Sequence, residues 1–182
     1  MNITKFFYSF YCQIKYHIFA KNIFIGKHVV LKNKKRISFS ENVHVCSNSI
    51  LICGGQLKIS NNVYIGFFSE IMACHKVEIE DNVIIGPYLF ITDSNHEYRD
   101  INTPICYQGA PKNESTNMIT IGKDTWIGAH VSIIGNVSIG KHCVIAANSV
   151  VVKDIPDYSV AAGVPAKVIK KYSFEKEEWI KV

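Results

Sequence analysis

Residues 91–100, ITDSNHEYRD, bring together side chains that can bind a polar ligand and move a proton. Histidine in general suits the role of a general base at neutral pH, since the unperturbed pKa of this residue type is about 6.5, and His96 is the histidine of this stretch. A carboxylate on its second nitrogen would set the tautomer, and Asp93 and Glu97 are both near enough in sequence to supply one. The residues alone leave open whether His96 is such a base or a solvated loop histidine.

A regular repeat surrounds this stretch and is interrupted by it. Four similar segments, KNIFIGKHVVL, ENVHVCSNSIL, NNVYIGFFSEI and DNVIIGPYLFI, begin 20 residues apart, at Lys21, Glu41, Asn61 and Asp81. After the interruption an aliphatic residue recurs every six positions, at Ile121, Ile127, Ile133, Ile139, Ile145 and Val151. A period of six is neither helical nor that of a hairpin, and three such units make a coil of 18 residues. The period predicts an all-β solenoid of triangular cross-section with short parallel strands, whereas a β-sandwich gives no reason for a strict six.

A protruding loop is predicted over residues 92–120. Ile91 and Ile121 are separated by 29 residues, whereas the repeat needs only five or seven. Long loops on rigid scaffolds commonly carry function. Within it we favour Asp93 as the carboxylate that orients His96, because Asp93 lies at the edge of the coil and Glu97 lies further out.

Four further residues are candidates for contact with an acceptor substrate. Asn95 could hold a substrate hydroxyl, and Tyr98 and Arg99 follow it on the same loop. His75 lies among the extra corner residues one coil earlier, so it could line the same pocket. The remaining histidines recur at turn positions, where a structural role is the simplest interpretation.

Composition predicts one domain with a buried core, since the chain has 182 residues of which 48% are hydrophobic. The net charge of +5 fits an anionic ligand, an anionic membrane surface or an ordinary polar surface, and the lysines at 32–36 and 167–171 make only a weak nucleic-acid patch. The six cysteines form no C-x-x-C pair, so we expect reduced thiols in a cytoplasmic protein with no metal site. No apolar run approaches the ~18 residues of a membrane span, and we expect no signal peptide.

The two ends of the chain differ from the repeat. Residues 1–20 are predicted to form an N-terminal segment, in which apolar residues of the stretch 3–19 have helical spacing. This amphipathic helix would either cap the open first coil or dock peripherally on a membrane surface. The β-helix is expected over residues 21–171, and 172–182 are expected to form a short helical or frayed tail.

The sequence ITIGKDTWIGAHVSIIGNVSIGKHCVIAANSVVVKDIPDYSVAAGVPAKVIKK resembles the hexapeptide-repeat acyltransferases. It is most similar to their sugar O-acetyltransferase branch, which includes the galactoside, maltose and colanic-acid acetyltransferases. The resemblance covers residues 59–171, and the earlier coils only by repeat pattern. It implies a left-handed parallel β-helix, acetyl-CoA as donor, no metal, and a homotrimer with active sites between neighbouring subunits.

The resemblance also assigns roles to individual residues. Relatives carry T-G-S-H-D-Y-R with the histidine as base, which implies that role for His96 in TDSNHEYR, although this chain has one extra residue and Asp93 in place of Gly. The remaining implied residues contact coenzyme A: backbone groups of Ala129 and Ala147 along the pantetheine arm, Trp126 near the acyl end, and Lys153, Lys167 and Lys170 at the phosphates. Val152 replaces a hydroxyl residue of the relatives on the adenine side.

The expected function is acetyl-CoA-dependent O-acetylation of a sugar hydroxyl, in surface polysaccharide assembly and by direct transfer. Three alternatives stay open. The first is N-acetylation of a nucleotide-linked amino sugar with the same donor groove. The others are a γ-type carbonic anhydrase, which needs three clustered zinc histidines, and a non-catalytic trimeric scaffold.

Overall fold

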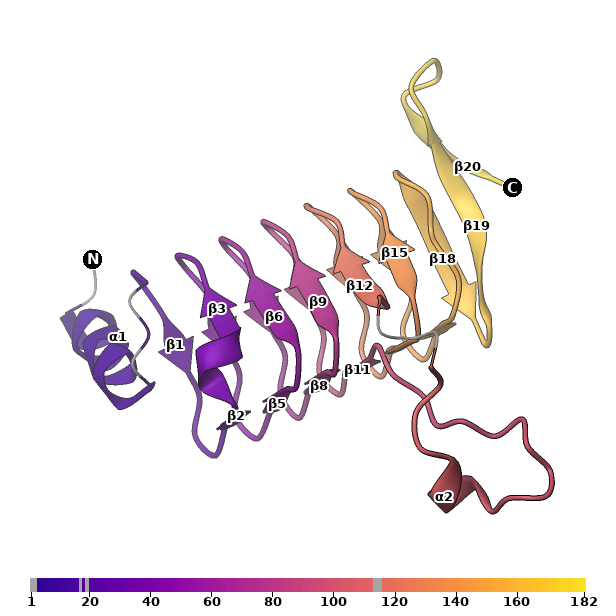
Figure 1. The fold of residues 1–182 in the computed structure, drawn as a ribbon. Coiled ribbons are helices and arrows are strands. Elements are labelled where there is room, and N and C mark those ends of the chain that lie inside the picture. The colour runs from indigo at the N-terminus through magenta and orange to yellow at the C-terminus, as the bar shows by residue number, and fades with distance from the viewer. Residues whose placement is uncertain (1–2, 17, 19, 113–115) are drawn as a thin grey trace.

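The structure is a computed structural model that describes residues 3–16, 18, 20–112 and 116–182. Residues 1–2, 17 and 19 of the predicted N-terminal segment and 113–115 of the predicted loop lie outside the described residues, as do the side chains of residues 3–6. The chain winds into a long prism, with a helix at one end, a strand pair at the other and a loop standing out from one edge (Figure 1).

Three sheets form the faces of the prism, and in each of them the strands of successive coils pair in parallel. The first face is a nine-stranded sheet of β1 (Phe24–Ile25), β4 (His44–Val45), β7 (Tyr64–Ile65), β10 (Ile84–Ile85), β13 (Trp126–Ile127), β16 (Val144–Ile145), β18 (Ser159–Gly163), β19 (Ala166–Ser173) and β20 (Glu178–Lys181). The second face is a six-stranded sheet of β2 (Val30–Lys32), β5 (Ile50–Cys53), β8 (Glu70–Ala73), β11 (Phe90–Thr92), β14 (Ser132–Ile134) and β17 (Val150–Val151). The third face is a five-stranded sheet of β3 (Ile37–Phe39), β6 (Gln56–Ile59), β9 (Lys76–Ile79), β12 (Met118–Ile121) and β15 (Val137–Ile139).

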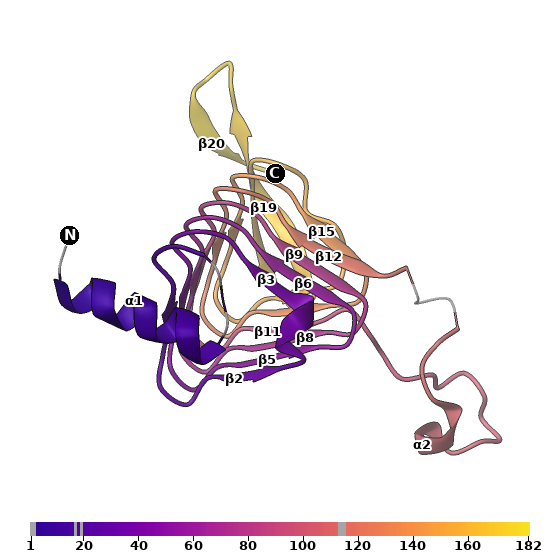
Figure 2. The ribbon, with the colours of Figure 1, turned by 60° about the vertical axis from the view of Figure 1, so that its left-hand side comes forward.

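The handedness can be followed from the N-terminal end. There the chain runs from β2 to β3 counterclockwise as the coils recede (Figure 2). The fold is therefore the predicted left-handed parallel β-helix.

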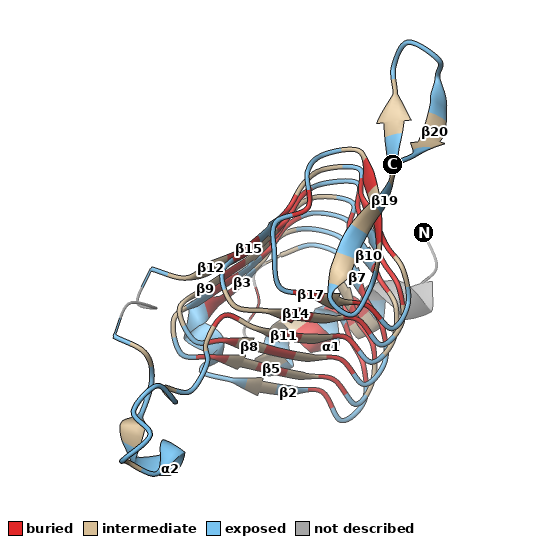
Figure 3. Ribbon diagram, turned by 90° about the vertical axis from the view of Figure 1, so that its right-hand side faces the viewer, coloured by how far each residue is buried: buried red, intermediate tan, exposed pale blue. Residues whose placement is uncertain are grey.

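The recurring aliphatic residues form the core of the prism. Those of the C-terminal coils are 0 or 1% exposed: Ile121, Ile127, Ile133, Ile139, Ile145 and Val151. Parallel pairing keeps equivalent residues in register, as in Ile91 between Ile71 and Ile133. Buried residues consequently form continuous lines along the inside of each face (Figure 3).

An asparagine ladder runs along one edge of the prism. Each amide nitrogen donates to the next side-chain oxygen, from Asn22 to Asn42, Asn62, Asn82 and finally Asp124, at 2.8–3.0 Å. All five residues have a left-handed backbone, with φ between 55° and 61°. Asparagine tolerates this conformation better than most residues, so one residue type satisfies both the turn and the ladder.

Substitutions at Asn62 separate the contribution of the ladder hydrogen bonds to stability from that of the left-handed backbone conformation. Asn62→Ala loses the ladder hydrogen bonds and adds a left-handed penalty of roughly 1–2 kcal/mol, whereas Asn62→Gly loses the hydrogen bonds alone. At about 2–4 °C per kcal/mol, we expect thermal unfolding midpoints to fall by about 4–8 °C for alanine and about half of that for glycine. Equal falls, measured by circular dichroism, would show that the backbone conformation contributes nothing.

The protruding loop and the tail differ in detail from the sequence expectation. β11 continues through Thr92 and β12 begins at Met118, because both ends pair with neighbouring coils, so the loop is 93–117 and not 92–120. It contains the short helix α2 (Ile105–Gln108). The expectation of a helical or frayed tail was wrong: β19 and β20 pair antiparallel, and the ring of Tyr172 packs edge-on against Trp179 at 5.5 Å.

The N-terminal helix α1 (Ile3–Tyr16) lies across the open end of the first coil (Figure 2). The Tyr8 hydroxyl donates to the Ile25 carbonyl at 2.7 Å, and the backbone N–H of Ile23 donates to Ser9 Oγ at 3.0 Å. These bonds use backbone groups that the first coil has no preceding coil to pair. None of the described helices combines the length and apolarity needed to cross a bilayer.

Candidate active site

The base of the loop is anchored by a buried carboxylate. Asp93 is 0% exposed, and its oxygens accept hydrogen bonds from the backbone N–H groups of Cys74 at 2.7 Å, His75 at 2.9 Å and Lys76 at 2.6 Å. A buried carboxylate is stable only with such a set of donors, and the corner at 74–76 supplies three. Asp93 therefore ties the start of the loop to the preceding coil.

His96 follows three residues later and is exposed. Within the described residues, neither Asp93 nor Glu97 forms a hydrogen bond with its imidazole. Glu97 instead accepts from the backbone N–H groups of Tyr98 and Arg99 and from the Arg99 guanidinium. The orienting role of Asp93 stays a prediction.

The Arg99 guanidinium, helped by the backbone N–H groups, lowers the pKa of Glu97 to about 2. Because this pKa is lowered in the folded chain, the stabilising effect of the pair is present above the ordinary glutamate pKa. It is lost as the pH falls through about 2. Arg99 is thus held by Glu97 at neutral pH, and its predicted contact with substrate is not tested.

Two more candidates lie at the same edge as Asp93 and His96. His75 occupies the corner beneath the loop, and its Nε2 atom is buried with no hydrogen-bond partner among the described residues. The amide of Asn95 lies beside Gly135, where its Nδ2 would be 4.0 Å from an added Cβ. The structure therefore brings four of the predicted residues together where the six-stranded and five-stranded sheets meet.

The rest of the loop has its own hydrogen bonds. Gln108 Nε2 donates to the carbonyls of Asp100 at 2.7 Å and Thr103 at 2.6 Å. The backbone N–H of Asn102 and the Thr103 hydroxyl donate to the Asp100 carboxylate and lower its pKa. Large apolar side chains nevertheless face solvent, with Tyr98 68%, Ile101 95% and Tyr107 80% exposed. The described part of the loop, 93–112 and 116–117, thus combines internal hydrogen bonds with exposed apolar side chains.

The residues implied for coenzyme A lie mainly along a different edge, where the nine-stranded and six-stranded sheets meet. Ala129 and Ala147 stack there on successive coils, since the Asn148 N–H donates to the Ala129 carbonyl at 2.9 Å. A Cβ on Gly128 would lie 2.6 Å from the Ala147 nitrogen, so the coils are in close contact. Trp126, on the strand leading to this edge, is 56% exposed.

The three predicted lysines do not gather at one place. The edge that carries Ala129 and Ala147 is called the alanine edge, and the edge that carries the loop is called the loop edge. Lys167 pairs with Ala162 in the last turn. This turn continues the alanine edge, because the Gly163 N–H donates to Ser149 Oγ at 3.1 Å. Lys170 pairs with Val160 further along β19. Lys153 is exposed just after β17, at the loop edge.

The two edges are far apart within one chain. From Ala129 to Gly135, beside which Asn95 lies, the backbone runs the width of the six-stranded sheet, up to ~20 Å at ~3.3 Å per residue. A whole face of the prism therefore separates Asn95 and the base of the loop from Ala129 of the same chain. Within the described ranges, no group of three or more His, Cys, Asp or Glu residues could hold a metal ion.

Comparison with known proteins agrees with the repeat and the fold. The profile of the bacterial transferase hexapeptide (six repeats) family matches residues 118–153. Rv3034c of Mycobacterium tuberculosis, named a probable acetyltransferase, is 45% identical over 83 residues, covering 46% of this chain and 26% of that protein. WbbJ of Escherichia coli K12, named as a candidate lipopolysaccharide biosynthesis O-acetyl transferase, is 40% identical over 96 residues, covering 51% of this chain and 49% of that protein. The chain thus spans half or less of the length of these relatives.

Solved structures share the fold over most of the chain. AntD, an N-acyltransferase from Bacillus cereus in complex with dTDP and 3-hydroxybutyryl-CoA, superposes with a TM-score of 0.78 at 23% identity, over 93% of this chain and 91% of that chain. The chain is thus similar to the hexapeptide-repeat transferases over residues 118–153 and shares the fold of AntD over most of its length.

Proposed function

We propose that the protein is an acetyl-CoA-dependent O-acetyltransferase that acetylates a sugar hydroxyl in surface polysaccharide assembly. The observation that carries the proposal is His96, presented at a rigid edge by the buried Asp93 next to Asn95 and His75. The name of the WbbJ relative supports O-acetyl transfer, and the acyl-CoA in the AntD complex supports the donor.

In the proposed reaction, the His96 imidazole takes the proton of the sugar hydroxyl as its oxygen attacks the thioester carbonyl. The new C–O bond forms and the C–S bond breaks. The leaving thiolate of coenzyme A takes the proton from the imidazolium, so the imidazole returns to its starting state. No covalent acyl-enzyme is required.

We further propose a homotrimer, in which the loop edge of one chain meets the alanine edge of the next. The ~20 Å between these edges in a single chain supports this assembly, and so does the exposed apolar loop surface of Ile101 and Tyr107. A three-fold axis parallel to the prism would let each chain use both edges and form three equivalent sites. We place the protein in the cytoplasm, since all six cysteines are free thiols.

One alternative is N-acylation of a nucleotide-linked amino sugar. The fold similarity to AntD favours it, because that N-acyltransferase was solved with dTDP-4-amino-4,6-dideoxyglucose and coenzyme A, with a TM-score of 0.76 at 21% identity. Both reactions use the same donor, so the acceptor distinguishes them.

The test is release of free thiol from acetyl-CoA with a panel of neutral sugars, oligosaccharides and nucleotide-linked amino sugars. Faster release with a hydroxyl acceptor, and an ester in the product by mass spectrometry, would support O-acetylation. Amide formation with an amino sugar alone would select the alternative. Absence of coenzyme A binding in calorimetry would contradict both and leave a scaffold or an anhydrase to be tested.

The donor position is tested by Ala147→Phe. Ala147 is exposed at the alanine edge, so a phenyl group there would occupy the proposed path of the pantetheine arm without disturbing the core. We expect coenzyme A affinity to fall about tenfold or more in calorimetry, with thermal stability unchanged. Gln56→Phe, also exposed but on a different face, is the matched control. Equal affinity of both variants and the wild type would remove Ala147 from the donor site.

A further inference from the structure

The helix α1 is apolar on two opposite sides. One side faces the prism through Tyr8, Ser9 and Cys12, and Cys12 is 0% exposed. A helix turns by about 100° per residue, so the opposite side carries a stripe made of Phe10, Tyr11 and Ile14. These three side chains are exposed, Phe10 by 54%, Tyr11 by 51% and Ile14 by 60%. Capping the first coil therefore uses one apolar side and leaves the other in solvent.

A cluster of cations lies beside the C-terminal end of α1. The 3-10 turn η1 (Lys34–Arg36) follows β2 at the same end of the prism, and Lys32, Lys34, Lys35 and Arg36 are all exposed. Lys15 of α1 lies between the two features, because its Nζ is 5.6 Å from the ring centre of Tyr11 and the residue shares a hollow with Lys34 and Lys35. None of these lysines belongs to an ion pair within the described part of the chain.

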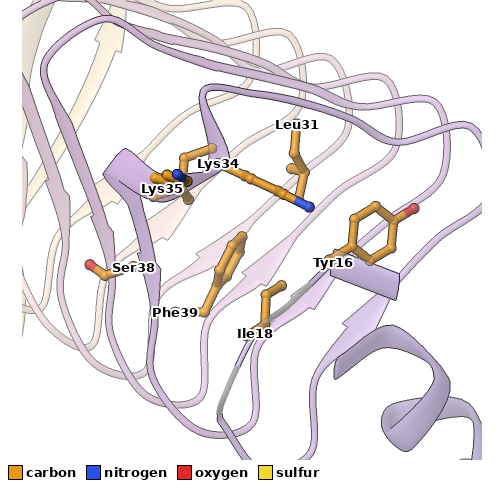
Figure 4. A pocket seen from close by; sticks show the side chains of 8 residues that line it. Tyr16, Ile18, Leu31, Lys34, Lys35, Ser38 and Phe39 are labelled. Atoms are coloured by element: carbon orange, nitrogen blue, oxygen red, sulfur yellow. The ribbon is translucent and has the colours of Figure 1, made fainter. Parts of the chain in front are cut away.

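A second hollow of about 610 Å³ opens between the end of α1 and this turn (Figure 4). It is lined by apolar side chains, among them Tyr16, Ile18, Leu31 and Phe39, and by Lys34 and Lys35. Leu31 is only half-buried because no coil precedes the first one. The hollow combines apolar walls with positive charge, which suits an anionic amphiphile.

We propose that the N-terminal end of the prism docks on the anionic surface of a lipid bilayer. The stripe of Phe10, Tyr11 and Ile14 enters the headgroup region, while Lys15 and η1 meet the lipid phosphates. Aromatic and aliphatic side chains flanked by flexible lysines are the chemistry that an interfacial helix uses.

Two features favour a lipid surface over a second copy of the chain. A symmetric contact through this end would bring the two basic clusters together, and like charges repel. The docking end is also remote from the loop, which stands out from the other half of the prism (Figure 1). Membrane contact would leave the candidate active site open.

The test is co-sedimentation of the full chain with vesicles of phosphatidylcholine, with and without about 30% phosphatidylglycerol. We expect binding to the anionic vesicles that weakens as salt is raised. Phe10→Ser/Ile14→Ser and Lys34→Glu/Lys35→Glu should each lower partitioning about tenfold or more. The matched controls, Phe174→Ser and Lys176→Glu/Lys181→Glu, change exposed residues of the C-terminal hairpin and should bind as the wild type does.

All these substitutions are at exposed positions, and circular dichroism checks that each variant is folded. Wild-type protein that stays in the supernatant with anionic vesicles would overturn the proposal. So would equal binding by the N-terminal variants and the controls. A lower mass of Phe10→Ser/Ile14→Ser in light scattering, without vesicle binding by the wild type, would assign the stripe to a contact between copies.

Discussion

Replacing His96 by alanine is expected to lower the rate of acetyl transfer to a hydroxyl acceptor by about 100-fold or more, while coenzyme A still binds. A positioned base contributes a factor of this size, because without it the sugar hydroxyl must lose its proton to water. His96 is exposed at the loop edge, so its loss removes no core packing. Ala129, Ala147 and Lys167, which we propose to contact the donor, lie on another edge of the chain, so we expect affinity for coenzyme A to stay as in the wild type.

The measurement compares thiol release and calorimetric coenzyme A affinity in His96→Ala and in His28→Asn. His28 is an exposed histidine at a left-handed turn, with φ of 58°, and asparagine keeps that turn. The control should match the wild type in both assays. If His96→Ala turns over as fast as the wild type, the base is another group. If it loses coenzyme A affinity as well, His96 contacts the donor and the proposed division between the two edges is wrong.

The coil could be predicted from the sequence because its period leaves few alternatives. A residue such as Ile127 has its equivalents 18 residues along the chain, and each must point inward to exclude water from a narrow prism. The pairing of Ile127 with Ile85 and Ile145 follows from the same count, once the loop is removed. The position of Lys153 also follows: it is six residues beyond Ala147, so the period places it one edge further on.

The hydrogen bonds at the base of the loop could not be predicted in this way. The extra residues Cys74 and His75 widen one corner, and the period does not show which of their backbone N–H groups lack a partner in the next coil. Asp93 meets those groups only because the chain leaves the coil at that point. Adjacency in sequence suggested His96 as its partner, whereas the structure shows contacts to residues 17–19 positions earlier.

The two ends show a similar limit. Helical spacing predicts an amphipathic α1 but does not show that apolar residues occupy two opposite sides of it, one against Ile25 and one in solvent. In the tail, the pairing of Tyr172 with Trp179 depends on Glu177, which adopts a left-handed turn that few glutamates adopt. The residues next to Glu177 do not predict a left-handed turn.

Asp93→Asn is expected to lower the thermal unfolding midpoint by about 6–12 °C. The amide keeps one oxygen but turns an NH₂ group toward a backbone N–H, so at least one buried donor loses its partner and the charge of the acceptor is lost. These losses amount to roughly 3 kcal/mol, and a chain of this length shifts by about 2–4 °C per kcal/mol. Asp154→Asn is the matched control: this exposed carboxylate at the same edge accepts a single bond, from the Ser138 N–H at 2.8 Å, so we expect a shift below about 2 °C.

The turnover rate of folded Asp93→Asn distinguishes whether Asp93 acts on His96 by anchoring the loop or by direct contact with the imidazole. We expect a fall of about tenfold or more, because the loop that carries the imidazole loses its anchor. If Asp93→Asn melts as the wild type does but is inactive, the carboxylate acts directly on the imidazole, as the sequence suggested, and the three amide bonds are incidental. If its midpoint falls but each folded molecule turns over normally, Asp93 stabilises the coil alone and the position of His96 is set elsewhere in the loop.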